Sequence, residues 1–126
     1  MRLFARGRYA VRFTQDPQQV ERAQRLRHAA FIAGRDGAAL DGDRALGLDR
    51  DAFDPLCTHV LIEEARTGEM VCCFRMLPLA SGADIGMSYS AQYYELSALA
   101  DFPEPMVELG RFCLAPGCKD PDVIRI

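Results

Sequence analysis

The sequence predicts a single α/β (α+β) domain with one helix after the first strand of a sheet. Three observations indicate this fold class. An alternating segment at about residues 8–14 precedes a capped helical segment at 17–33. Two apolar runs, 58–65 and 70–79, flank a short turn that contains glycine, and a further strand-like run covers 106–114. With 126 residues, of which 49% are hydrophobic and 26% charged, the chain is suited to one moderate core and not to disorder.

Charge is distributed unevenly along the chain. The net charge is -3, yet residues 1–35 hold eight arginines against two acids. This segment, of about +6, indicates an acidic partner, namely an acidic protein, a phosphate-bearing cofactor or a membrane surface, and a solvated arginine face is the alternative. The acidic total and the lack of a recognition motif argue against nucleic acid as a partner. The start of the chain has no uninterrupted apolar run typical of a signal peptide or membrane span, so we expect a cytoplasmic protein.

The first strand and the helix are defined by alternation and by end signals. The letters "YAVRFTQD" alternate apolar and polar residues, which is typical of a half-buried strand. Asp16 and Pro17 then supply an N-cap and a first helical residue. Arg27 falls within the apolar stripe of this helix. Because an unpaired buried guanidinium is costly, we expect Arg27 either to meet a carboxylate or to reach water along its own stem.

Residues 34–55 form a glycine- and aspartate-rich segment without periodicity, which predicts a loop. Its "DGDRALG" stretch departs from a calcium-binding loop, since Ala45 and Leu46 stand where an oxygen ligand and a glycine are required. A loop of this length inside a compact domain is typically functional, and its aspartates are candidates for lining a site for a cationic substrate. The five cysteines are odd in number and lack a C-x-x-C pair, so neither disulfides nor structural zinc are expected.

The second half of the sequence predicts a hairpin, an irregular connection and a last strand. Arg75 stands within the second hairpin strand, where a solvent-facing position is the simplest interpretation, and a short helical turn is expected near 93–99. The last strand carries Glu108 and Arg111, which would face opposite sides of a regular strand. Gly110 between them predicts a bulge, which would bring both side chains towards one site.

Several stretches together resemble one enzyme family. They are "RAQRLRHAAF", "DAFDPLCTHVLI", "GEMVCCFRMLP", "YSAQYYELSAL" and, most specifically, "ELGRFCLAP" followed by "DPDVIRI". The resemblance, which spans about residues 9–126, is to the ornithine-acyl carrier protein N-acyltransferases, which make lyso-ornithine lipid. These enzymes have the GCN5-related N-acetyltransferase fold, with a mixed, mostly antiparallel sheet, and are related to the acyl-homoserine lactone synthases. The lactone synthases carry a tryptophan after the first helix, and this chain has none.

The resemblance implies an activity and a set of site residues. The expected reaction moves a (3-hydroxy)fatty acyl group from acyl carrier protein, or from acyl-CoA, to the α-amino group of ornithine, with no tightly bound cofactor and no metal. The matching positions imply a catalytic pair, Glu108 and Arg111. They imply substrate-binding residues Arg27, Phe31, Asp51, Asp54, His59 and Arg75. They also imply a cradle for the pyrophosphate of the acyl-phosphopantetheine donor at Gly117, Cys118, Lys119 and Arg125.

Chemical roles follow for these residues. Glu108 is the candidate general base for the substrate ammonium, while Asp51 and Asp54 are candidates for holding cationic groups. Arg27, Arg75 or Arg111 would hold the substrate carboxylate. An alternative is that Glu108 and Arg111, with Arg27 and Asp54, form a buried ion-pair network that only ties the helix to the sheet. The arginine-rich start suits docking of an acidic acyl carrier protein, and the amphiphilic product suggests a peripheral membrane contact.

The chain stops just as a segment begins to look helical. We therefore expect residues 1–126 to be one incomplete acyltransferase domain, the N-terminal part of a larger enzyme without the C-terminal strands and helices of the fold, and inactive by itself. Two other functions are open. One is an acyl-homoserine lactone or other N-acyl amino acid synthase of the same fold, and the other is a non-catalytic acyl-carrier-binding module.

Overall fold

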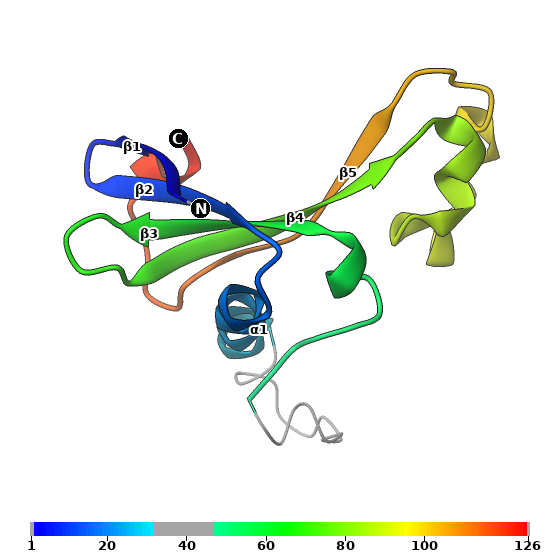
Figure 1. Ribbon diagram of the computed structural model, residues 1–126. Helices are drawn as coiled ribbons and strands as arrows, with labels where there is room; N and C mark the ends of the chain where they lie inside the picture. The colour runs from blue at the N-terminus through cyan, green and yellow to red at the C-terminus, as the bar shows by residue number, and fades with distance from the viewer. Residues whose placement is uncertain (1, 32–46, 126) are drawn as a thin grey trace.

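A five-stranded antiparallel sheet with one covering helix forms the framework (Figure 1). The computed structural model describes residues 2–31 and 47–125. Each strand pairs with the next one in the chain, so the spatial order is the sequence order. The elements are β1 Arg2–Arg6, β2 Tyr9–Thr14, α1 Pro17–Phe31, β3 Thr58–Glu64, β4 Met70–Leu79 and β5 Met106–Leu114. The prediction of an α+β fold with a helix after the first predicted strand, which is β2, is confirmed.

The N-terminal part follows the prediction with one addition. Strand β2 begins at Tyr9, close to the expected start, but β1 precedes it and was not predicted. Gly7 makes the β1–β2 turn with φ of 58°, a conformation that favours glycine. The side chain of Asp16 accepts a hydrogen bond from the backbone of Gln18 at 3.0 Å, as an N-cap does. The expected helix end at residue 33 and the loop over 34–46 lie outside the described residues.

The hairpin of β3 and β4 is present as predicted, and its turn contains Gly68 with φ of 76°. Between β4 and β5 the chain forms three short 3-10 helices, Gly82–Met87, Ser90–Gln92 and Ser97–Leu99, and the last of them lies within the helical turn expected near 93–99. Two more 3-10 helices, Asp54–Leu56 and Pro121–Arg125, precede β3 and follow β5. The 3-10 helices Asp54–Leu56, Gly82–Met87 and Ser90–Gln92 were not predicted, because such short segments have few periodic signals.

The sheet has two differently covered faces. Helix α1 packs on one face, where the buried cluster is Ala23, Leu61, Cys73 and Cys113. The opposite face carries Tyr9, Val11, Val60, Ile62 and Cys72, covered by Val123 from the C-terminal 3-10 helix. Figure 1 shows α1 and the C-terminal segment on opposite sides of the sheet. Cys72 and Cys73 therefore lie on opposite faces, as expected from strand alternation, and all five cysteines are free.

A bulge interrupts β5 beside the expected glycine. Cys113 pairs with Cys73 and Gly110 with Arg75, so two residues, Arg111 and Phe112, oppose the single residue between them on β4. Arg111 adopts φ of 49°, which is uncommon for a residue with a side chain. The bulge is thus centred one residue beyond Gly110. Glu108, two residues before Gly110, faces the α1 side, and the extra residue turns Arg111 to that side as well.

No helix among the described residues is long and apolar enough to cross a membrane.

Candidate functional site

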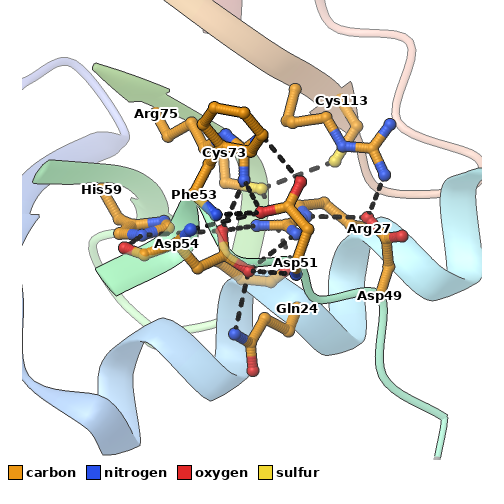
Figure 2. A network of polar contacts seen from close by, with 12 residues as sticks. Gln24, Arg27, Asp49, Asp51, Phe53, Asp54, His59, Cys73, Arg75 and Cys113 are labelled. Atoms are coloured by element: carbon orange, nitrogen blue, oxygen red, sulfur yellow. Dashed lines mark hydrogen bonds and ion pairs between the residues drawn. The ribbon is translucent and has the colours of Figure 1, made fainter. Parts of the chain in front are cut away.

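A buried network of ion pairs occupies the α1 face of the sheet (Figure 2). Its cations are Arg27 from α1 and Arg75 from β4, with 1% and 4% of their side chains exposed. Its anions are Asp49, Asp51 and Asp54, which lie in the segment that leads into β3. Charged groups are rarely buried this deeply unless they are paired and hydrogen-bonded.

Arg27 is fully engaged by two aspartates. Its Nη1 and Nη2 donate to the two carboxylate oxygens of Asp54 at 2.7 and 3.0 Å, and its Nε donates to Asp49 at 2.9 Å. This bidentate geometry is the strongest form of an arginine–carboxylate pair. The expectation that Arg27 meets a carboxylate is confirmed, and the alternative that it reaches water along its stem is wrong.

Arg75 is held in the same way from the β4 side. Its Nη1 donates to Asp51 and Asp54, both at 2.7 Å, and its Nη2 donates to the second oxygen of Asp51 at 2.9 Å. The solvent-facing interpretation of Arg75 is therefore wrong. Asp54 joins the two arginines, and it also accepts hydrogen bonds from the Gln24 side chain at 3.1 Å and from the backbone of Asp51 at 3.2 Å.

The network fixes the ionisation of its carboxyl groups. Burial raises the pKa of Asp54, but the hydrogen bonds and charges of Arg27 and Arg75 outweigh burial and hold that pKa well below its usual range. The pKa of Asp51 is lowered for a related reason, because burial is outweighed by the Arg75 hydrogen bonds and charge. Both aspartates are consequently anionic at neutral pH.

His59 lies under the network on β3 and is buried. Its Nε2 is 3.0 Å from the backbone oxygen of Asp54, which can only accept, so we assign the proton to Nε2. Burial lowers the pKa of His59, which keeps the ring neutral at pH 7. Its Nδ1 is buried and has no hydrogen-bond partner in the described part of the chain. His59 therefore supports the backbone at the start of the 3-10 helix Asp54–Leu56.

Arg111 joins the network at its edge. Its Nη2 donates to Asp49, so Asp49 bridges Arg111 and Arg27. The guanidinium lies over the rings of Phe31 and Tyr89, with 5.1 and 6.0 Å between the guanidinium carbon and the ring centroids. The bulge in β5 thus delivers Arg111 to the same site as Arg27, although the two residues are far apart in sequence.

Glu108 has a different environment. Its two carboxylate oxygens accept hydrogen bonds from the backbone N–H groups of Tyr89 and Ser90 at 2.8 and 3.0 Å. Glu108 forms no ion pair with a side chain of the described segments. The alternative of one ion-pair network that contains Glu108, Arg111, Arg27 and Asp54 is therefore right for three of these residues and wrong for Glu108.

Two aromatic residues near the arginines were missed in the sequence. The Arg75 guanidinium carbon is 5.4 Å from the ring centroid of Tyr89 and 5.7 Å from that of Phe53. The two rings contact each other edge to face, with 5.4 Å between centroids. Both residues lie in irregular segments, where hydrophobic periodicity gives no signal, so only a three-dimensional view reveals their position.

The residues expected to hold the donor pyrophosphate are not part of this network. Gly117, Cys118 and Lys119 form the turn after β5, and Arg125 ends the 3-10 helix that covers the opposite face of the sheet. Arg125 lines a hollow of about 380 Å³ together with Arg6, Arg8, Tyr9 and Asp122. This hollow joins the basic start of the chain to the C-terminal turn.

A second, larger hollow lies beside the network. Its volume is about 640 Å³, and it opens between the first half of α1 and the segment before β3. Its lining residues include Glu21, Gln24, Asp51, Asp54 and Cys57.

Across residues 2–31 and 47–125, no group of three or more histidine, cysteine or acidic side chains is arranged to bind a metal ion.

Comparisons with known proteins agree with this architecture. Residues 26–126 match the family model of the acetyltransferase (GNAT) domain. The chain is 34% identical over 113 residues to an L-ornithine N(alpha)-acyltransferase from Rhodobacter capsulatus. That match covers 86% of this chain and 44% of the relative, so the chain spans less than half of the relative's length. No solved structure matches the chain. Because the family model covers most of the sequence, including the hairpin and the bulged β5, the chain belongs to the GNAT acetyltransferase domain family.

Proposed function

We propose that the protein transfers a fatty acyl group from an acyl-phosphopantetheine thioester to the α-amino group of ornithine, giving lyso-ornithine lipid. The observation that carries this proposal is the 34% identity to an ornithine N(alpha)-acyltransferase, within a chain of the GNAT family. The site supports it chemically, because a substrate with both ammonium and carboxylate groups needs a site with charges of both signs. Arg27, Arg75 and Arg111 meet three aspartates there.

The reaction requires an uncharged amine. The amine nitrogen attacks the thioester carbon, the new C–N bond forms, the C–S bond breaks, and the departing thiolate takes up a proton. Glu108 is the proposed base that removes the proton from the ammonium group. Its two oxygens each accept one backbone N–H, and a carboxylate oxygen has a second lone pair that remains available. Glu108 can therefore hold its neighbouring backbone and accept a proton at the same time.

The substrate side of the site is assigned to the α1 face. Glu108 and Arg111 face this side of the sheet, and Arg111 lies beside Asp49 and the Tyr89 ring. The hollow of about 640 Å³ is lined by Asp51 and Asp54 but by neither Glu108 nor Arg111, so we do not take it as the ornithine site. We place ornithine, rather than the acyl donor, near this face.

The donor side is assigned to the turn after β5 and to the basic start of the chain. Arg12 and Arg22 both pair with Glu63, so they are less available to a partner. Arg6 and Arg8 are exposed and line the hollow that also contains Arg125, and Arg8 pairs at 3.6 and 3.9 Å with Asp120 and Glu64 while 63% of its side chain remains exposed. This arrangement supports an acidic acyl carrier protein as the donor, docked with its phosphopantetheine phosphate near residues 117–125. The amphiphilic product would partition to a membrane surface.

The test uses the full-length protein in a bacterium that makes no ornithine lipid. Lipid extracts are analysed by mass spectrometry with the wild-type protein and with Glu108→Gln. We expect a new acyl-ornithine species that is lost or strongly reduced in the variant. An acyl-homoserine lactone or another N-acyl amino acid in the extract would show that the acceptor is not ornithine. If a folded protein gives no new amide, a non-catalytic carrier-binding module is favoured. An acyl-ornithine yield unchanged by Glu108→Gln would remove Glu108 from the role of base.

A further inference from the structure

Glu108 hydrogen-bonds the segment between β4 and β5 to strand β5. Glu108 accepts hydrogen bonds from two consecutive N–H groups of this segment, those of Tyr89 and Ser90. Hydrogen bonds to a charged acceptor are stronger than neutral ones. The base of the segment is closed separately, where the backbone N–H of Gly82 donates to the backbone oxygen of Phe102 at 2.8 Å. Glu108 therefore fixes the backbone at Tyr89, while the hydrogen bond between Gly82 and Phe102 joins the two ends of the segment.

The position of the Tyr89 ring follows from this backbone contact. The ring lies near the guanidinium groups of Arg75 and Arg111 and packs against Phe53 and Tyr93, with centroid distances of 5.4 and 5.5 Å. An aromatic face attracts a guanidinium group, and the attraction is stronger where water is excluded. Tyr89 thus holds two arginines of the site without forming an ion pair with either.

The three arginines of the site differ in how many hydrogen-bond donors they have available for a ligand. Arg27 and Arg75 each donate three hydrogen bonds to aspartates, and 1% and 4% of their side chains are exposed. Arg111 donates one, to Asp49, and 26% of its side chain is exposed. Its Nε is buried with no partner among the described residues. Arg111 is therefore the arginine with donors available to a ligand.

Arg111 is also held in an uncommon conformation. Its backbone has φ of 49°, and its guanidinium carbon lies 5.1 Å from the ring centroid of Phe31 and 6.0 Å from that of Tyr89. Such backbone strain persists only where surrounding contacts enforce it, and it is frequent at functional sites. These ring contacts restrict the movement of the guanidinium, whose N–H groups are the part that can meet an anionic group.

We propose that Glu108 and Tyr89 together position Arg111 as the anchor for the carboxylate of the amino-acid acceptor. Glu108 fixes the backbone of Tyr89, and the Tyr89 ring, together with Phe31, contacts the Arg111 guanidinium. Tyr89 is a positioning residue in this arrangement, because it acts through Arg111. The inference rests on the proposed acyl transfer to an amino acid, and it selects one arginine from the three that could bind the carboxylate.

The test compares two ligands that differ by one group. Ornithine and 1,4-diaminobutane carry the same two amines, and only ornithine has the carboxylate. Their dissociation constants are measured by calorimetry with the full-length protein. We expect wild type to prefer ornithine, and we expect Tyr89→Leu to reduce this preference about tenfold, since the aromatic face is lost. Tyr89→Phe, which keeps the face, should retain the preference. Tyr94→Leu is the matched control, because Tyr94 is an exposed tyrosine of the same segment.

Two measurements distinguish the positioning role of Glu108 from its proposed role as a base: the ligand preference and the NMR resonance of Arg111. Glu108→Ala removes both backbone contacts, so the ornithine preference should fall as it does in Tyr89→Leu, a change that loss of a base alone does not cause. In ligand-free protein, the Nε–H resonance of Arg111 in ¹⁵N NMR spectra should move in Glu108→Ala and Tyr89→Leu, and stay in Tyr94→Leu.

The outcomes distinguish this inference from the proposed function. A wild-type protein that forms acyl-ornithine but keeps its ligand preference in Tyr89→Leu would refute the role of Tyr89 and leave the enzyme assignment intact. A wild-type protein that does not prefer ornithine over 1,4-diaminobutane would refute a carboxylate anchor altogether. An Arg111 resonance unaffected by Glu108→Ala would refute the clamp formed by Glu108.

Discussion

Asp54→Asn is the substitution that most directly tests the buried network. The Asp54 carboxylate accepts hydrogen bonds from Arg27, Arg75 and Gln24, and 4% of its side chain is exposed. Asparagine keeps the size and one oxygen but removes the charge. Breaking a buried ion pair by removing one partner costs about 3–5 kcal/mol. Because Arg27 retains Asp49 and Arg75 retains Asp51, we expect the lower end, about 3 kcal/mol.

The assay is equilibrium unfolding in urea with a matched surface control. Glu21→Gln makes the same kind of change in an exposed pair, since Glu21 and Arg25 are one helical turn apart and 45% and 58% of their side chains are exposed. Exposed helical pairs contribute about 0.3–0.5 kcal/mol, so the control should barely shift the midpoint. Equal shifts for Asp54→Asn and Glu21→Gln would refute the conclusion that Asp54 carries the network.

The pH dependence gives an independent check on Asp54. Its pKa in the folded protein is lowered, since its hydrogen bonds and charge contacts with the arginines outweigh burial. A carboxyl group of this kind stabilises the fold fully above its unfolded pKa of about 3.9, and this contribution is lost as the pH falls through the folded value. The wild-type free energy of unfolding should therefore fall steeply below about pH 4, and more gently in Asp54→Asn.

Three further predictions concern the rest of the fold. His59→Gln keeps a donor near the Asp54 backbone oxygen but removes a ring whose pKa is lowered by burial. Unfolding of the variant no longer takes up a proton at this position. The loss of stability as the pH falls below about 6.5 should therefore become smaller, as measured by urea unfolding across pH. Leu61→Ala should lower the free energy of unfolding by about 2–5 kcal/mol, because Leu61 is fully buried on the sheet face that α1 covers. Leu109, at 64% exposed, is the control, and Leu109→Ala should change thermal stability little. Equal effects would contradict the two-faced core. Tyr9 donates a hydrogen bond to Asp120 at 2.6 Å, which with burial raises the pKa of Tyr9 to about 12. The pKa of Tyr89 is also raised, mainly by its hydrogen bond with Tyr93, so ultraviolet titration should show late tyrosine ionisation that Tyr9→Phe reduces and does not abolish.

The framework was predictable because its signals are local. Alternation identified β2, Asp16 and Pro17 identified the start of α1, and the apolar runs around Gly68 identified the hairpin. The extra strand β1 was missed because its sequence, "RLFAR", is short and gains its partner only from β2. Of the three 3-10 helices between β4 and β5, Gly82–Met87 and Ser90–Gln92 were missed because such short turns carry no periodicity.

The sequence predicted several residues of the site but not which of them contact one another. A charge within an apolar stripe marked Arg27, and a glycine beside Arg111 marked the bulge. Which carboxylate meets which arginine depends on how the segment before β3 crosses the sheet, and no sequence pattern determines that path. The contact between Glu108 and the backbone of Tyr89 joins residues 19 positions apart across an irregular segment. Backbone donors have no residue-type signature, so that contact required the structure.

The balance of charge in the site leads to a final prediction about the acceptor. Three arginines meet three aspartates in the network, while Glu108 adds a further negative charge with no cationic side-chain partner in the described residues. Ornithine, with two ammonium groups and one carboxylate, carries one net positive charge at neutral pH and would offset Glu108. Norvaline has the same carbon chain without the second ammonium group and carries no net charge. We therefore expect wild type to bind ornithine more tightly than norvaline in calorimetry with the full-length protein, and Glu108→Gln to reduce that preference. A preference that survives in Glu108→Gln would show instead that carboxylates such as Asp51 recognise the second ammonium group, since the two acceptors differ in no other charge.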